Sequence, residues 1–485
     1  MKKIFLSVAL VATTLVAQAG GYLTNTNQNV AFLRNPAQDA SINLNGVYSN
    51  PAGVSFMEKG FHLGVNWQAA FQTREVTSSF APFALGVKNA GQSSKLFKGE
   101  AQAPVIPSLQ AAWVGERWSF HLNAALVGGG GKAEYKQGLA SFESLVAAYG
   151  ALAATRLDIN RDGKYGDFKG YDVDAHMSGR QYYFGATLGA GYKFNDNWAA
   201  YLGARAILAS AHYEGYLRNM QLLTAGNQLT PAAPIFAGAA QAAATAGAPA
   251  PIVAQLRQGA ALASGVAIDT EQSGFGLAPI LGLHYHNNRL DLAAKYEFST
   301  PIELSNKAKN NAVAEASPNL AAYHDGAKTR SDIPALLTLG ARYAVLDGLR
   351  LSAGYHLYFD QAAQSGSATT GWKNKAIDGN TQELLFGAEY DVTSDIEVSA
   401  GLQHTMYPNT DAMMHDASFT VNSTSLGLGV GYKLSDRVKL NVAYFQTFYD
   451  KYTKQSANYN GTQIAGSDVF TRTNQVVGVG VEVKI

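Results

Sequence analysis

The chain has 485 residues, no cysteine and a formal net charge of +1, and charged residues make up only 15% of it. A charge so near zero gives no electrostatic reason to expect a nucleic-acid partner. The absence of cysteine excludes disulfides, thiolate metal sites and cysteine catalysis.

The first residues have the three parts of a secretory signal peptide. Two lysines precede an apolar run at 4–16, and the small-residue triplet Ala17-Gln18-Ala19 forms a cleavage site. We therefore expect residues 1–19 to be removed on export. The segment 20–60 that follows is rich in Asn, Gly, Ser and Ala and lacks strand alternation, so we expect a compact irregular segment with short helical turns.

From residue 61 to the end, the chain is dominated by segments with a period of two. In 289–298, for example, Leu290 and Leu292 face one way while Asp291 and Lys295 face the other. An apolar stripe opposite a charged one suits a wall between lipid and a wet lumen. Fourteen strands are predicted, near 61–75, 104–116, 117–134, 176–194, 197–216, 270–286, 289–303, 332–345, 349–360, 380–392, 396–406, 421–434, 438–449 and 472–485.

The predicted connections alternate between very short and long. Short polar turns lie at Glu116-Arg117, Asn195-Asp196-Asn197, Asn287-Asn288, Asp347-Gly348, Ser394-Asp395 and Ser435-Asp436-Arg437. Long loops lie near 76–103, 135–175, 217–269, 304–331, 361–379, 407–420 and 450–471. Residues 61–485 are therefore predicted to form an all-β, 14-stranded antiparallel transmembrane barrel. A soluble β-sandwich or solenoid is the alternative, but it gives no reason for loops to be short on one side only.

A four-residue motif stands just before the first predicted strand. Pro51 fixes its own φ angle and keeps Asn50 extended, and Gly53 permits a sharp exit into the wall. Asn50, Pro51, Ala52 and Gly53, placed ahead of a fourteen-strand pattern, resemble the hatch motif of the FadL-type outer-membrane transporters. The resemblance implies that residues 20–60 form a hatch inside the barrel lumen, and that the protein is a channel and not an enzyme.

Four consecutive glycines interrupt the third predicted strand. Gly128, Gly129, Gly130 and Gly131 weaken the ladder and favour a bulge. FadL-type barrels have an inward kink in their third strand that opens a hole in the wall, so the resemblance implies that the kink lies here. The alternative is a flexible strand end that leads into a loop.

The long loop 217–269 carries apolar residues that would be costly to leave exposed. They are Leu222, Leu223, Ile235, Phe236, Ile252, Val253 and Leu256. The resemblance implies that external loops capture hydrophobic ligands, but these residues would also suit helices packed on the barrel mouth. For a ligand with a carboxylate, Arg180, Arg205 and Arg218 are the predicted lumen cations.

One external loop has part of a calcium-binding pattern. Asp158, Asn160 and Asp162 supply oxygens at positions one, three and five, and a glycine follows at six. Position twelve is Lys169 in place of the usual glutamate, so the alternative is a set of Asx-turns. No other cofactor is predicted.

The sequence thus predicts a monomeric channel in the bacterial outer membrane for passive uptake of long-chain fatty acids or aromatic hydrocarbons, with lateral exit at the kinked third strand. Its partners would be the hydrophobic ligand and outer-membrane lipid. A general diffusion porin is one alternative, although the segment 20–60 would block an open lumen. An outer-membrane lipid hydrolase is the other, and it would need a Ser–His pair at one rim.

Overall fold

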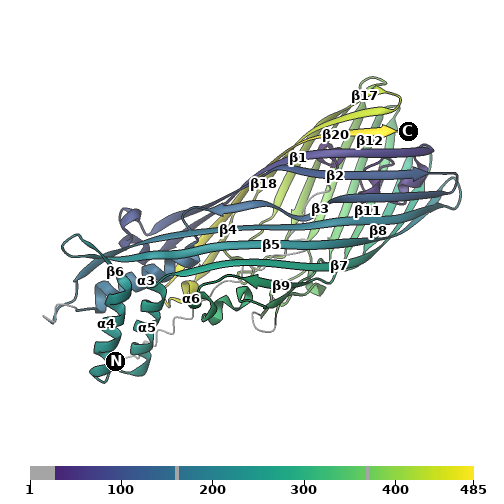
Figure 1. Cartoon of the computed structure of the whole chain (residues 1–485). Helices are drawn as coiled ribbons and strands as arrows, with labels where there is room; N and C mark the ends of the chain where they lie inside the picture. The colour runs from purple at the N-terminus through teal and green to yellow at the C-terminus, as the bar shows by residue number, and fades with distance from the viewer. Residues whose placement is uncertain (1–27, 159–162, 368–370) are drawn as a thin grey trace.

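The computed structural model describes residues 28–158, 163–367 and 371–485. Its main feature is a closed antiparallel β-barrel (Figure 1), in which the first strand pairs with the last. Fourteen strands form the wall, which confirms the predicted fold class and strand number. The wall strands are β1 (Gly60–Phe80), β2 (Ser94–Val114), β3 (Trp118–Tyr135), β4 (Phe168–Lys193), β5 (Trp198–Thr224), β7 (Val266–His286), β8 (Leu290–Glu297), β11 (Leu336–Leu346), β12 (Leu349–Tyr358), β15 (Gln382–Asp391), β16 (Ile396–Met406), β17 (Ser423–Ser435), β18 (Val438–Tyr449) and β20 (Gly466–Lys484).

The two rims of the barrel differ as the connection lengths predict. At the short-turn rim, pairs of wall strands are joined by two to four residues, at 115–117, 194–197, 287–289, 347–348, 392–395 and 436–437. At the long-loop rim, several strands run much farther than predicted, and β4 and β5 reach 26 and 27 residues. Strands that continue beyond the lipid need no apolar outer face, so their period-two signal fades there while their ladder hydrogen bonds persist.

Every remaining element except the hatch lies in a connection at the long-loop rim, where Figure 1 shows α3, α4 and α5 grouped at one end of the molecule. The short strands are β6 (Leu229–Pro231), β9 (Glu303–Ala308), β10 (Lys328–Ser331), β13 (Ser365–Ser367), β14 (Gly371–Trp372) and β19 (Tyr452–Ser456). The helices are α3 (Ala140–Arg156), α4 (Ala232–Thr245), α5 (Ala250–Ala263), α6 (Ala312–Glu315), η2 (Ala81–Leu85), η3 (Val87–Asn89), η4 (Pro318–Tyr323), η5 (Asp360–Ala362), η6 (Lys373–Lys375) and η7 (Tyr459–Gly461). Within the described residues, no helix is both long and apolar enough to span a membrane.

The outer surface of the barrel is apolar, as a lipid-facing wall requires. Val477, Val479 and Val481 of β20 are each more than a third exposed. Near the short-turn rim, tryptophan side chains point outward, and the rings of Trp113 and Phe120 stack with centroids 5.9 Å apart. Aromatic girdles of this kind mark the membrane interfaces of outer-membrane barrels.

The hatch lies inside the lumen and precedes β1. Its described part contains α1 (Val30–Arg34), α2 (Gly46–Ser49) and η1 (Gly53–Phe56), which agree with the short helical turns expected there. Nearly all of its side chains are buried against the inner wall. The predicted signal peptide at 1–19 and the first hatch residues lie outside the described part of the chain.

Candidate functional site

Charged and polar side chains join the hatch to the inner wall on several sides. Arg34 Nη2 donates to Glu397 Oε1 at 2.7 Å, and Gln38 Nε2 donates to Glu389 Oε1 at 3.0 Å. Further bonds between hatch and wall join Asp39 to His356, Tyr48 to Lys295 and Asn29 to Gln110. Since these wall residues come from β2, β8, β12, β15 and β16, the hatch is held around most of the lumen.

The motif 50–53 fixes the second half of the hatch to β7. Asn50 Nδ2 lies 3.1 Å from the Ser41 carbonyl oxygen and 3.0 Å from His284 Nδ1, while Asn50 Oδ1 accepts from Gly53 N at 3.3 Å. A Cβ on Gly53 would lie 2.2 Å from Asn50 Nδ2. A side chain at position 53 would therefore push the Asn50 amide out of these bonds, and the role of Gly53 in a sharp exit into the wall stays a prediction.

His284 also belongs to a cluster of metal-ligand types at the short-turn rim. Donor atoms of His284, His286 and Asp291 lie within 4.8 Å of one another. Asp291 Oδ1 is 2.6 Å from His286 Nδ1, and Asp291 Oδ2 accepts from Arg342 Nη1 at 3.3 Å. These bonds already use the ligand atoms, so we interpret the cluster as the wall's support for Asn50.

The wall itself is interrupted between β2 and β3. From the short-turn rim, the ladder runs as far as the pair Ser108 and Ala125, and it resumes only at Gln102 and Lys132. Residues 103–107 of β2 and 126–131 of β3 therefore do not pair with each other. Pro104 and Pro107 lie in this unpaired stretch and have no N–H to offer a neighbouring strand.

The glycine run forms the other side of this interruption. Gly129 and Gly131 have φ angles of +74° and +71°, and the register between β3 and β4 also shifts between Gly129 and Lys132. A Cβ on Gly129 would lie 2.1 Å from the carbonyl oxygen of Gln181. Side chains are thus excluded by both backbone conformation and space.

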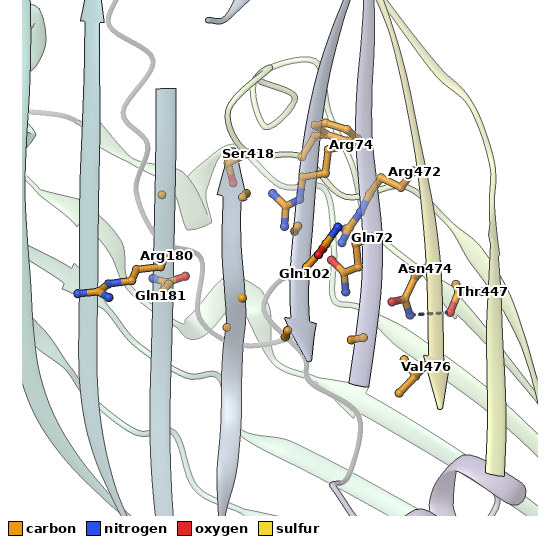
Figure 2. Close-up of a pocket in the computed structure, with 18 of the residues that line it drawn as sticks. Gln72, Arg74, Gln102, Arg180, Gln181, Ser418, Thr447, Arg472, Asn474 and Val476 are labelled. Atoms are coloured by element: carbon orange, nitrogen blue, oxygen red, sulfur yellow. Dashed lines mark hydrogen bonds between the residues drawn. The ribbon is translucent and has the colours of Figure 1, made fainter. Parts of the chain in front are cut away.

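A cavity of about 250 Å³ lies in the lumen next to the interrupted wall (Figure 2). Gln28 of the hatch lines it on one side, and Ala103, Ile106 and Gly129 line it where the ladder is broken. Phe419, from the connection between β16 and β17, lines it toward the long-loop rim. The cavity is therefore bounded by hatch, wall gap and an external loop.

That external loop, residues 407–422, is here called the roof loop. Its Asp416 is buried, and Asp416 Oδ2 accepts from the backbone N–H of Ser141 at 2.6 Å, in the first turn of α3. Tyr135 Oη donates to the Asp416 carbonyl oxygen at 3.3 Å. Burial raises the pKa of Asp416 to about 6, and the nearby Asp468 carboxylate adds to the rise.

We expect the attachment of the roof loop to depend on pH. The pKa of docked Asp416, about 6, lies above its ordinary value of 3.8, so docking is strongest below about pH 4 and weakens as the pH rises to 6. Charged or titratable groups that act near it are Asp468, Lys454 and Tyr135. In hydrogen exchange corrected for intrinsic rates, protection of the roof loop should fall about tenfold or more over this range. An Asp416→Asn variant that showed the same fall would contradict this assignment.

The chain resembles known proteins in its fold. No family model matches the chain, and no curated protein matches it in sequence. Solved structures do match: a FadL homologue from Pseudomonas aeruginosa is 15% identical with a TM-score of 0.60, and the alignment covers 96% of this chain and 100% of that one. The chain has the FadL fold.

Two toluene transporters share the FadL fold with this chain. TodX of P. putida is 15% identical with a TM-score of 0.52, and the alignment covers 91% of this chain and 94% of TodX. TbuX of Ralstonia pickettii is 15% identical with a TM-score of 0.52, over 95% of this chain and 99% of TbuX. The similar structures are therefore transport proteins, and the likeness at this identity concerns the fold.

Within this FadL-type barrel, the three predicted lumen cations lie in different places. Arg180 lines the central cavity. Arg205 is buried near the hatch, where its Nη1 is 2.6 Å from Glu297 Oε2 and its guanidinium lies 4.8 Å from the Tyr48 ring. Arg218 stacks on an external tyrosine ring at 4.1 Å and lines a separate cavity of about 510 Å³. Only Arg180 of the three therefore faces the cavity.

The apolar residues predicted to capture ligand mostly pack together in an external cluster with α3. Leu222, Phe236 and Leu256 are buried there, Leu223 and Ile235 are half-buried, and Ile252 is 47% exposed. None of these six lines the central cavity. The arrangement favours the packing role that the sequence left open, and the ligand role stays a prediction.

The predicted calcium loop falls largely outside the described residues. Asn160 and Asp162 are not described, and the Asp158 carboxylate accepts from the Gly163 backbone at 2.8 Å. That bond spans five residues, whereas an Asx-turn bond reaches the backbone two residues on, so it does not decide between the two alternatives. Calcium binding stays a prediction.

A Ser–His contact of the kind that the hydrolase alternative requires is present near the short-turn rim. His121 Nε2 lies 2.8 Å from Ser119 Oγ, and Ser55 of the hatch covers Ser119 at 2.9 Å. Both wall residues are buried, and His121 Nδ1 has no hydrogen-bond partner among the described residues. The histidine is thus not oriented by a carboxylate, as a catalytic triad requires.

Sequence reasoning missed two arginines that line the cavity, Arg74 on β1 and Arg472 on β20. The period-two signal was sufficient to place them. In β1, the even-numbered residues, such as Gln68, face the lumen. In β20, Val477 faces outward, so its even-numbered neighbours face the lumen. Both arginines occupy such positions.

Proposed function

We propose that this FadL-type barrel is an outer-membrane channel for the passive uptake of small hydrophobic molecules, which leave sideways between β2 and β3. The observation that carries the proposal is that the central cavity meets the interrupted ladder at Ala103 and Gly129. The toluene transporters of the same fold support a substrate of this kind.

A side exit solves a physical problem for an apolar solute. The hatch fills the lumen toward the short-turn rim, so a straight path would require its removal from many polar bonds. The gap leads instead toward the bilayer, where an apolar molecule is more stable than in water. Leaving ladder groups unpaired in lipid is costly, so a gap in the wall favours a functional use.

The proposed route starts at the long-loop rim. A solute would pass the roof loop, occupy the cavity above the hatch and leave through the gap between 103–107 and 126–131. Transport would follow the concentration gradient and need no energy source. The site would be in the bacterial outer membrane, and one chain contains every element of the route, which favours a monomer.

The test measures uptake of a radiolabelled arene, alkane and long-chain fatty acid by cells with and without the protein. Faster uptake of at least one of them is expected. Equal uptake of all three would contradict the proposal. In planar bilayers, the intact protein should give no large steady current, because such a current would indicate an open diffusion porin. Hydrolysis of ester substrates by the purified protein would indicate the hydrolase instead.

A further inference from the structure

Two arginines face each other across the closure of the barrel. Arg74 of β1 is paired in register with Arg472 of β20, and both side chains line the central cavity. Figure 2 shows them on neighbouring strands beside Gln72 and Gln102, with Arg180 farther along the wall. Like charges directly opposite each other on adjacent strands repel, so this pair destabilises the empty barrel.

Two buried arginines at the hatch are neutralised, whereas Arg74 and Arg472 have no carboxylate partner in the described structure. Arg34 and Arg205 each contact a glutamate, at 2.7 and 2.6 Å. In contrast, no aspartate or glutamate is among the described residues that line the central cavity. The Nε atoms of Arg74 and Arg472 are buried without a hydrogen-bond partner in the described structure. The cavity therefore has positive charge and unused donors, which together suit an anion.

The rest of the lining indicates the body of the ligand. It is rich in amide and hydroxyl side chains, which would be left unpaired beside a long alkyl chain. Aromatic rings of Tyr135, Tyr213, Phe445 and Tyr449 also line it. At about 250 Å³, the cavity is slightly smaller than the usual pockets for drug-sized ligands. These features together suit a compact ring with a polar substituent.

We propose that the central cavity binds a compact aromatic carboxylate, with its carboxylate between Arg74 and Arg472 and its ring against the tyrosines. This inference rests on the proposed channel function for the place of the cavity on the route, and it adds an anionic ligand class to the hydrophobic solutes proposed above. The bound carboxylate would offset the repulsion between the two arginines and accept a charge-assisted hydrogen bond from each of them. A neutral ring would gain neither, and the long alkyl chain of a fatty-acid carboxylate would leave the amide side chains of the cavity unpaired.

Binding to the purified full-length barrel in detergent tests the proposal by calorimetry at neutral pH. The probes are benzoate, the neutral amide benzamide, and decanoate. Benzoate is expected to bind about tenfold or more tightly than either of the others. Replacing both arginines (Arg74→Gln with Arg472→Gln) should weaken benzoate binding by a similar factor and leave benzamide unchanged. Arg117→Gln, which removes an exposed charge in the turn 115–117, is the matched control and should bind like the wild type.

Three results would overturn the inference: benzamide binding as tightly as benzoate, decanoate binding more tightly than benzoate, or unchanged benzoate binding in a double variant that migrates as a folded barrel in unheated gel samples. Failure of the channel function can be distinguished from failure of the anion site. If cells with the protein take up no arene, alkane or fatty acid faster, the proposed function fails, while calorimetry still decides the anion site.

Discussion

Glu397→Gln is expected to loosen the hatch and make the closed barrel leak ions. Glu397 on β16 accepts from three cations: Arg34 of the hatch at 2.7 Å, Arg350 at 2.9 Å and Lys439 at 3.2 Å. Removing its charge leaves Arg34 and Lys439 without a carboxylate partner in the described structure, while Arg350 keeps Asp391. Breaking a buried pair in this way costs about 3–5 kcal/mol, and partial exposure of Glu397 lowers that figure.

Two measurements follow the loosening. Hydrogen exchange in α1 should speed up by about tenfold or more, which corresponds to a loss of roughly 1.4 kcal/mol of local stability. Single-channel recordings should show current steps that the wild type lacks. Glu116→Gln is the matched control, because Glu116 pairs with Lys59 on the surface of the short-turn rim and its side chain is 82% exposed. Slow exchange in α1 and a closed channel in Glu397→Gln would show that other bonds suffice to hold the hatch.

Replacing Gly129 and Gly131 by valine is expected to abolish most uptake while the barrel still inserts. Both residues have positive φ angles, which cost a β-branched residue about 1–3 kcal/mol each. The Cβ at Gly129 would also collide with the Gln181 carbonyl. Relief of both strains requires β3 to straighten toward β2, and that movement narrows the gap beside the cavity.

Uptake of the transported solute should fall about tenfold or more, as expected when the productive geometry is lost. Gly238→Ala is the control, because Gly238 lies in α4 and a Cβ there meets no atom within 4 Å. Gel migration before and after heating monitors folding of each variant. Wild-type uptake by a folded double variant would exclude the gap as the exit.

Much of the barrel follows from period-two alternation, because lipid on one side and water on the other impose opposite polarity on successive residues. The turns of the short-turn rim were located by Asn, Asp and Gly, which tolerate left-handed backbone angles. The extra length of β4 and β5 was not predicted, since no lipid shapes their sequence beyond the membrane. The sequence likewise predicts a long loop where α4 and α5 lie, although it identifies the apolar residues of that segment.

The site was harder to predict than the wall, because it depends on pairs that are distant in sequence. Nothing near Arg205 in the chain indicates that Glu297 neutralises it, and nothing near Arg74 indicates that Arg472 lies opposite. Asp416 accepts a hydrogen bond from Ser141 of α3, which is 275 residues away in the sequence. The irregularity at the glycine run, by contrast, could be predicted, because glycine acts on the backbone locally. Its use as an exit stays a prediction.

The unpaired stretch of β2 has a consequence for the protein before and after insertion. A closed barrel has no free strand edges, but the gap exposes one at 103–107. Exposed edges can recruit a strand from another molecule and start aggregation. Pro104 and Pro107 present no N–H for an incoming strand, so they limit such pairing along the unpaired part of the described β2–β3 ladder.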